Sequence, residues 1–304
     1  MTRDLEIVWQ CGNICNAHCP YCINAPEAKK AWRNATLEET KKVIAAVNAM
    51  PVRLLHVLGG EPTCFEHIHR VVREVNCPEI RLSTNGIAVQ VIAQLAEEAN
   101  TALSAYLSVH PSVVEADPTA FRQRTEQLVT MAETGKLREL HMFMMIDGYR
   151  PMSTAFADTC AWLTTDPRTL PYVDASFVRR GTEDLHAQIV DLVHACSKAP
   201  PAVRKYLMGV RTDILRPNPW LGKRCMHFRH RFTLQLDGYM VSGDCLQKHI
   251  SRRSVYDPAF NWADELVTCI CRQPRMVCNG GCMAAHNVPK RSEVKDLQPY
   301  LDKW

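Results

Sequence analysis

Three cysteines near the start of the chain are spaced to hold an iron-sulfur cluster. Cys15, Cys19 and Cys22 are separated by three and then two residues, so one compact loop can carry all three thiolates. Thiolates are the usual protein ligands of such clusters. Because three thiolates ligate three irons, the fourth iron of a [4Fe-4S] cluster stays open to another ligand, as in a catalytic metal site.

A zinc site is the competing interpretation of the same cysteines. Structural zinc takes four protein ligands, so a further residue such as His18 or Cys11 would have to complete it. Zinc sites usually show paired ligands two to four residues apart, and we therefore favour the cluster. We expect Cys11 to be a small buried side chain, and we expect simple buried cysteines at Cys64, Cys77, Cys160 and Cys196.

Glycine and polar residues follow the next three predicted strands. Gly59-Gly60-Glu61-Pro62 comes directly after a strand predicted over Val52 to Leu58, and glycines there would let the backbone approach a ligand. Ser83 and Asn85 lie at the end of the third predicted strand, and Ser108 lies at the end of the fourth. Ordinary turn and helix-cap chemistry explains these last three residues equally well.

These motifs together resemble the radical S-adenosylmethionine (SAM) superfamily, which has this cysteine spacing and an aromatic residue before the third cysteine, here Tyr21. The resemblance implies that SAM chelates the open iron and is reductively cleaved to a 5'-deoxyadenosyl radical, which abstracts hydrogen from the substrate. It also implies that the glycine segment receives the SAM amino group. The SAM-binding residues implied are Tyr21, Gly59, Gly60, Glu61, Pro62, Ser83, Asn85 and Ser108.

The first two thirds of the chain predict an α/β fold. Short runs rich in branched residues alternate with helical periodicity, which predicts strand-helix units and a parallel sheet. Six such units would form a partial (β/α)6 TIM-like barrel with its site at the carboxyl ends of the strands. The strands are expected at Leu5 to Gln10, Val52 to Leu58, Glu79 to Thr84, Ala102 to Val109, Leu137 to Ile146 and Tyr172 to Val178. The helices are expected from Thr36, whose capping box uses Glu39, and at Phe65 to Val75, Ile87 to Ala99, Thr119 to Glu133, Ser153 to Leu163 and Glu183 to Cys196.

Composition narrows the class of protein. Fourteen cysteines among 304 residues favour metal or cluster ligation in a reducing compartment. No apolar run approaches a membrane span of roughly 20 residues, and the first residues lack a secretory signal, so we expect a cytoplasmic protein. The basic and acidic residues behind the formal charge of +4 are interspersed, which argues against a nucleic-acid partner.

Six cysteines near the end of the chain predict a second metal region. We divide the chain into a barrel over residues 1–216 and a small Cys-rich domain over residues 217–304. Cys278-Asn279-Gly280-Gly281-Cys282 resembles the auxiliary-cluster extension called SPASM, or twitch in its shortened form. The resemblance implies at least one auxiliary [4Fe-4S] cluster, although the spacing matches only in part and a zinc ribbon is the alternative. The candidate ligands are Cys225, Cys245, Cys269, Cys271, Cys278 and Cys282.

The resemblance also suggests substrates and partners, while the catalytic residues that act on the substrate stay unknown. The leading hypothesis is modification of a ribosomally made peptide by crosslinking, epimerisation or oxidation. With the first cluster cysteine at residue 15, we expect any leader recognition to come from a separate partner. Alternatives are a twitch-type dehydrogenase of a small natural product such as an aminocyclitol or sugar, a protein-activating enzyme, and a non-catalytic metal-binding module. An electron donor such as flavodoxin or ferredoxin is the expected redox partner.

Overall fold

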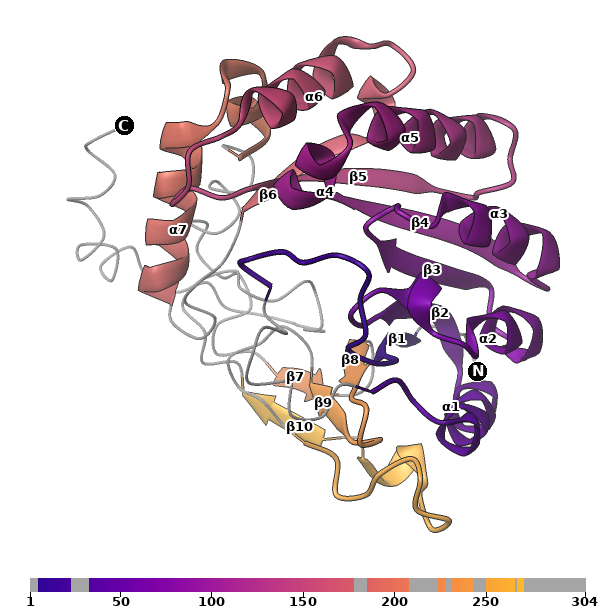
Figure 1. Ribbon diagram of the computed structural model, residues 1–304. Helices are drawn as coiled ribbons and strands as arrows, with labels where there is room; N and C mark the ends of the chain where they lie inside the picture. Colours follow the sequence, from indigo (N-terminus) through magenta and orange to yellow (C-terminus); the bar gives the residue numbers. More distant parts are fainter. Residues whose placement is uncertain are drawn as a thin grey trace.

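The computed structural model describes residues 5–22, 33–177, 185–207, 224–227, 231–242, 250–265 and 267–270. Within these ranges, residues 177, 185–190, 224–227, 242 and 267–270 are described by their backbone alone. The main element is an eight-stranded sheet in the order β6-β5-β4-β3-β2-β1-β8-β9, and it is parallel except for β9. The sheet curves, and the helices cover its outer face (Figure 1).

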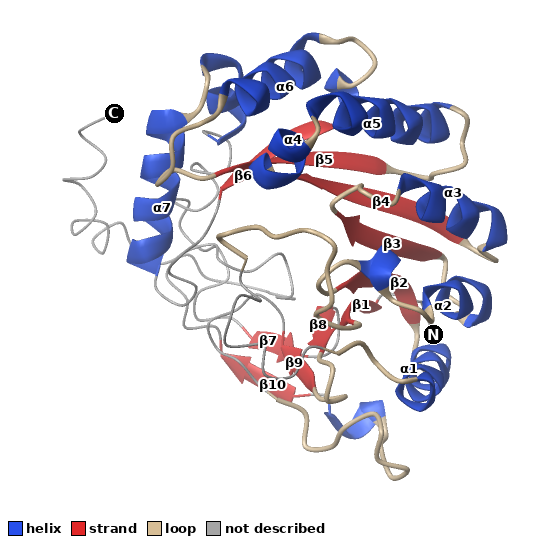
Figure 2. Cartoon of the chain, viewed as in Figure 1, coloured by secondary structure: helices blue, strands red, loops and turns tan. Residues whose placement is uncertain are grey.

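The predicted alternation of strands and helices is confirmed. The strands are β1 (Leu5–Gln10), β2 (Val52–Leu58), β3 (Glu79–Thr84), β4 (Ala102–Val109), β5 (Leu140–Ile146), β6 (Val173–Phe177), β8 (Arg231–Leu234) and β9 (Met240–Ser242). The helices are α1 (Leu37–Ala49), α2 (Ile68–Glu74), α3 (Val89–Glu98), α4 (Pro111–Ala116), α5 (Pro118–Glu133), α6 (Thr154–Thr165) and α7 (Leu185–Lys198). Figure 2 shows the α/β layering.

The helix α1 begins where its capping box predicts. The backbone N–H of Glu39 donates to Thr36 Oγ1 at 3.2 Å, and the N–H of Thr36 donates to Glu39 Oε2 at 2.8 Å. Two donors that have no partner inside the helix are satisfied in this way. The buried face of α1, which includes Val43 and Val47, then packs on the sheet.

Two elements start three residues later than expected, other boundaries differ by one or two residues, and one helix was not expected. The strand β5 starts at Leu140 instead of Leu137, because the Leu137 N–H donates to Met131 O at 3.0 Å and closes the end of α5. The helix α2 starts at Ile68 instead of Phe65, because Pro62–Cys64 forms a separate 3-10 turn. The short helix α4 was not expected, and Pro111 at its first position favours it.

The sheet extends beyond the six expected strands. β8, from the region predicted to form the second domain, pairs with β1 in parallel, with Val8 opposite Thr233. β9 then returns antiparallel to β8. The division at residues 216 and 217 stays a prediction, but the barrel sheet uses backbone from both sides of it.

The two faces of the sheet differ in chemistry. Side chains toward the helices, including Ile7, Trp9 and Leu55, are fully buried and apolar. Polar and aromatic side chains meet on the concave face, where Arg81 lies 4.3 Å from the ring centroid of Tyr106 and the Tyr106 ring packs on His141. This layer fills the barrel below the carboxyl ends of the strands.

His56 lies partly buried in this layer as a neutral imidazole. Its Nε2 lies 2.7 Å from Ser83 Oγ, and its ring packs against Tyr106. Burial, reinforced by the cations of Arg81 on β3 and Arg231 on β8, lowers the pKa of His56 from 6.5 to about 3. The unfolded chain therefore binds a proton that the folded chain resists between these two pH values.

We predict that His56 makes the fold acid-sensitive. Because the folded pKa is the lower one, its contribution to stability is complete above about pH 6.5 and is lost as the pH falls toward 3. The loss between pH 7 and pH 5 should be about 2 kcal/mol. Urea unfolding at both pH values should show a smaller loss in His56→Gln. His141→Gln, whose wild-type side chain is 44% exposed, should keep the full loss, and equal losses in both variants would contradict the prediction.

Candidate active site

The cysteine loop leaves β1 and runs across the carboxyl end of β2. The Cys11 N–H donates to Leu58 O at 2.8 Å and continues the strand pairing. The Gly60 N–H then donates to Gly12 O at 3.0 Å, and the Glu61 N–H donates to Ile14 O at 2.9 Å. Backbone hydrogen bonds therefore fix the part of the loop that precedes Cys15, the first cluster ligand in the sequence.

Glycine is required at Gly59 and Gly60 by this close approach. A Cβ atom at Gly59 would lie 2.5 Å from Gly12 O, and one at Gly60 would overlap Ile14 O. We expected these glycines to let the backbone approach a ligand. In addition, they let the cysteine loop lie directly on the end of β2.

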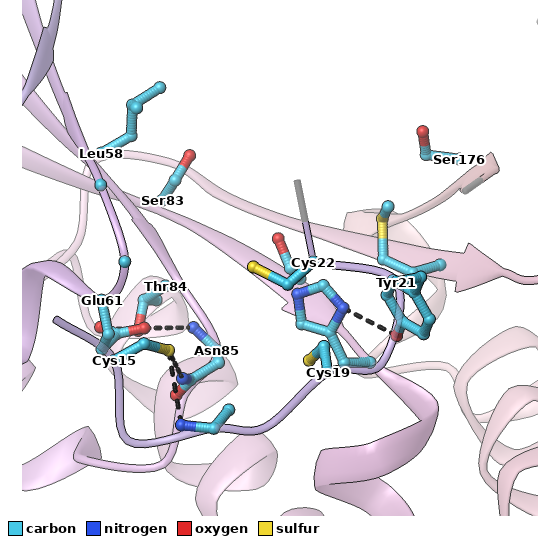
Figure 3. Close-up of a pocket in the computed structure, with 16 residues that line it drawn as sticks. Cys15, Cys19, Tyr21, Cys22, Leu58, Glu61, Ser83, Thr84, Asn85 and Ser176 are labelled. Carbon is cyan, nitrogen blue, oxygen red and sulfur yellow. Dashed lines mark hydrogen bonds between the residues drawn. The ribbon is translucent and has the colours of Figure 1, made fainter. Parts of the chain in front are cut away.

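All three predicted cluster ligands line one cavity of about 370 Å³ at the carboxyl ends of the strands (Figure 3). The same cavity is lined by seven of the eight predicted SAM-binding residues: Tyr21, Gly59, Gly60, Glu61, Ser83, Asn85 and Ser108. Pro62 is buried and begins the 3-10 turn behind the cavity. The spacing and the strand-end positions therefore bring the predicted residues together.

Six further residues line the cavity: Ala17, Leu58, Thr84, His110, Met145 and Ser176. The apolar run from Met142 to Met145 predicts strand core, and this prediction is wrong for Met145, which lines the cavity. Met142 and Met144 are fully buried, while Met145 alternates to the concave face. The period of two along a strand is the signal that identifies Met145 and Ser176.

Glu61 ties the end of β2 to the end of β3. Its Oε1 accepts hydrogen bonds from Thr63 N and Oγ1 at 3.1 and 2.8 Å and from Thr84 Oγ1 at 2.8 Å. Its Oε2 accepts from Asn85 N at 2.8 Å. Burial raises the pKa of the Glu61 carboxyl, while these hydrogen bonds favour the charged form and oppose the rise. The side chain therefore supports the wall of the cavity.

Asn85 contacts the first half of the cysteine loop. Its Nδ2 donates to Asn16 Oδ1 at 2.8 Å and lies 3.8 Å from Cys15 Sγ. The Ala17 N–H lies 3.4 Å from the same sulfur. These polar hydrogens suit a sulfur that carries negative charge. Burial raises the pKa of Cys15 in the ligand-free chain.

The second half of the loop is held by the junction between β4 and α4. Tyr21 Oη lies 3.0 Å from His110 Nδ1, and Cys19 Sγ lies 3.1 Å from Ser112 Oγ. Burial lowers the pKa of His110 to about 4, so the ring is neutral at pH 7. In Figure 3 Tyr21 lies on the side of the cavity opposite Glu61.

A fourth thiol lies beside the cavity. Cys64 is half-buried at the end of the 3-10 turn, and the backbone N–H of Asn16 donates to its sulfur. Its proximity contributes to raising the pKa of Cys15. We expected Cys64 to be a simple buried cysteine, because no spacing rule links it to the triad in the sequence.

The donor set fits an iron-sulfur cluster. In the described part of the chain, no three His, Cys, Asp or Glu side chains converge on one position for a single metal ion. A [4Fe-4S] cluster instead takes one thiolate at each of several irons, and three thiols face the same cavity here. The polar strand ends beside them provide hydrogen-bond donors and acceptors for a ligand of the open iron.

Residues 9–151 match the model of the radical SAM superfamily. This range of the chain is therefore similar to a radical SAM domain. This type of domain uses a [4Fe-4S] cluster together with SAM. The matched range contains the three cysteines, the glycine segment and the ends of β3 and β4.

Curated relatives match a part of this chain. The PqqA peptide cyclase of Bradyrhizobium diazoefficiens is 30% identical over 88 residues, which cover 29% of this chain and 23% of that protein. The GTP 3',8-cyclase of Aeromonas hydrophila is 30% identical over 124 residues, which cover 37% of this chain and 34% of that protein. The matches therefore span about a quarter of the first relative and about a third of the second.

One solved structure, anSMEcpe with bound AdoMet, is 14% identical to this chain with a TM-score of 0.49. The alignment covers 86% of this chain and 80% of that chain.

The predicted auxiliary ligands lie mostly outside the described residues. This applies to Cys245, Cys271, Cys278 and Cys282. Cys225 and Cys269 are described by backbone alone, on β7 (Arg224–His227) and β10 (Val267–Ile270), where they are directly opposite each other in an antiparallel pair.

None of the helices in the described ranges combines the length and apolar character that a bilayer crossing requires.

We predict that Glu61→Gln destabilises the ligand-free protein. The amide nitrogen of glutamine would face the Asn85 N–H or the donors at Oε1, so one buried donor would lose its partner. The expected cost is about 1–3 kcal/mol. Urea unfolding measures it, with Glu66→Gln as the control because that side chain is 75% exposed. Equal stability of the two variants would show that the tie between β2 and β3 is unimportant.

We also predict that Gly60→Ala prevents iron loading by displacing the cysteine loop from the end of β2. Iron and sulfide per chain after anaerobic reconstitution measure the effect. Gly135→Ala is the control, because Gly135 has a φ of 75° and no atom within 4 Å of an added Cβ. Its alanine variant should lose some stability and keep its iron, and full loading of Gly60→Ala would refute the steric argument.

Proposed function

We propose that this protein is a radical SAM enzyme that modifies a ribosomally made peptide. The observation that carries the enzymatic part is the convergence of Cys15, Cys19 and Cys22 with polar strand-end residues on one cavity, inside the range that matches the superfamily. The similarity of 88 residues of this chain to a PqqA peptide cyclase supports a peptide as substrate.

The three cysteines would hold a [4Fe-4S] cluster, and the cavity beside them would bind SAM. When bound, this pair supplies one-electron cleavage of SAM to a 5'-deoxyadenosyl radical that abstracts hydrogen from the substrate. The chain's own contribution is positioning. Hydrogen bonds from Gly60 and Glu61 fix the start of the loop, and Tyr21 and Asn85 anchor its two halves.

The cavity wall orients the adenosyl part of SAM and limits water. Ser83, Ser108 and Ser176 present hydroxyl groups that can donate or accept, and neutral His110 adds a ring nitrogen. Met145 provides an apolar, flexible surface beside them. The layer around Tyr106 closes the barrel below, so that we expect the substrate to enter from the carboxyl ends of the strands.

A small-molecule substrate is the second candidate. The similarity to a GTP 3',8-cyclase over 124 residues favours it, because the substrate in that relative's name is a nucleotide. The twitch-type dehydrogenase of an aminocyclitol or sugar belongs to the same candidate class. A precursor-peptide gene beside the gene for this protein would favour the peptide.

The proposal also includes at least one auxiliary cluster, a flavodoxin or ferredoxin as electron donor, and a cytoplasmic location. The paired positions of Cys225 and Cys269 on β7 and β10 support the first of these, since both are among the six candidate ligands. Fourteen cysteines suit a reducing compartment, which supports the location.

The triad predicts the outcome of a first assay. The anaerobically reconstituted protein should contain about eight irons and form 5'-deoxyadenosine from SAM after reduction. Alanine at Cys15, Cys19 and Cys22 together should remove about four irons and abolish 5'-deoxyadenosine. Cys160→Ala, which changes a fully buried thiol on α6, is the control and should leave both values unchanged. Zinc in place of iron, with no 5'-deoxyadenosine, would refute the enzymatic proposal.

Substrate class needs a separate measurement. A neighbouring precursor peptide should stimulate 5'-deoxyadenosine formation and change in mass, or take up deuterium from heavy water. GTP is the small-molecule probe. Stimulation by GTP alone would replace the peptide proposal with the second candidate.

A further inference from the structure

The polar environments of the Cys15 and Cys19 sulfurs differ. Cys15 is close to an amide of Asn85 and to the Ala17 N–H, at 3.8 and 3.4 Å. Cys19 is 3.1 Å from a side-chain hydroxyl, that of Ser112, which is 93 positions away in the sequence. This contact is shorter than both contacts to the Cys15 sulfur.

The direction of the Ser112 contact is fixed once Cys19 ligates iron. In the free thiol either atom can be the donor. A thiolate ligand has no proton, so the Ser112 hydroxyl must donate and the sulfur must accept. Tyr21 also interacts with the Cys19 sulfur, and its hydroxyl lies 3.0 Å from His110 Nδ1, where the histidine tautomer determines which atom donates.

Ser112 is held in place by its neighbours. It is the second residue of α4, directly after Pro111, and the N–H groups of Val113 and Val114 both donate to His110 O at 3.1 Å. Val113 and Val114 are buried and anchor the helix. The hydroxyl is therefore presented by packed backbone at the end of β4.

We infer that Ser112 donates a hydrogen bond to the Cys19 thiolate and thereby raises the reduction potential of the cluster that this thiolate would ligate. The inference rests on the proposed function, because it needs the cluster. Reduction adds one electron and increases negative charge on the sulfurs. A donor at a sulfur therefore stabilises the reduced cluster more than the oxidised cluster. Ser112 is a positioning residue in this role, since it acts through Cys19.

A second cavity beside Ser112 affects the choice of variants that can test the hydrogen bond. Ser112 also lines a cavity of about 530 Å³ on the other side of the loop, together with Pro20, Glu115 and Arg150. Water from this cavity could replace the hydroxyl in Ser112→Ala and hide part of the effect. Ser112→Val fills the space without a donor, and Ser112→Thr has nearly the same shape with the donor retained. The valine and threonine variants therefore form the matched pair.

The test is a one-electron redox titration of the reconstituted protein with a chemical reductant and without SAM. The electron paramagnetic resonance signal of the reduced cluster measures the extent of reduction. We expect Ser112→Val to have a lower midpoint potential, on the order of a tenfold change in the reduction equilibrium, or about 59 mV for one electron. Ser112→Thr should have the midpoint potential of the wild type. The midpoint potential of Ser112→Ala should equal that of the wild type or of Ser112→Val, or lie between them. Ser104→Ala is the control, because this buried serine of β4 has no hydrogen-bond partner among the described residues.

Equal midpoints in wild type and Ser112→Val would overturn the inference while leaving the proposed function intact. An equal shift in the valine and threonine variants would also overturn it, because bulk and not the hydrogen bond would then be responsible. A wild-type chain that binds no cluster would overturn the proposed function first.

Discussion

The site depends on the contact between two backbone segments at the carboxyl ends of β1 and β2. Gly12 and Ile14 accept hydrogen bonds from Gly60 and Glu61, and side chains at the two glycines would prevent this approach. The cysteine loop is therefore positioned by the sheet before it is positioned by metal. Glu61 extends the same constraint to β3 through its hydrogen bonds to Thr84 and Asn85. Three consecutive strand ends thus behave as one support for the cavity.

The polar surroundings of the cysteine sulfurs depend on this support and on a second support for the other half of the loop. Asn85 holds the first half of the loop, and the junction of β4 and α4 holds the second half through Tyr21 and Cys19. The sulfurs consequently lie in different polar surroundings, although the sequence presents them as equivalent ligands. Their surroundings, and not their spacing, distinguish them.

Most of the fold and of the triad site could be predicted from the sequence because both depend on local patterns. Strand alternation set the limits of β1 to β4 to the residue, and the capping box at Thr36 set the start of α1. Ser112 and Cys64 could not be predicted in this way, since their contacts with the loop depend on tertiary packing. Met145 was misjudged because a run of apolar residues hides which side of the strand each one faces.

The pairing of β8 with β1 has a consequence for the order of folding. The strand that carries the cysteine loop lies between β2, which is close in sequence, and β8, which is more than two hundred residues later. During synthesis, β1 can pair with β2 early, while its other edge stays unpaired until β8 leaves the ribosome. Such late, non-local pairing slows folding and leaves an exposed edge open to association with other chains. The nascent chain therefore has a sheet edge in need of protection beside the loop that gathers the metal ligands.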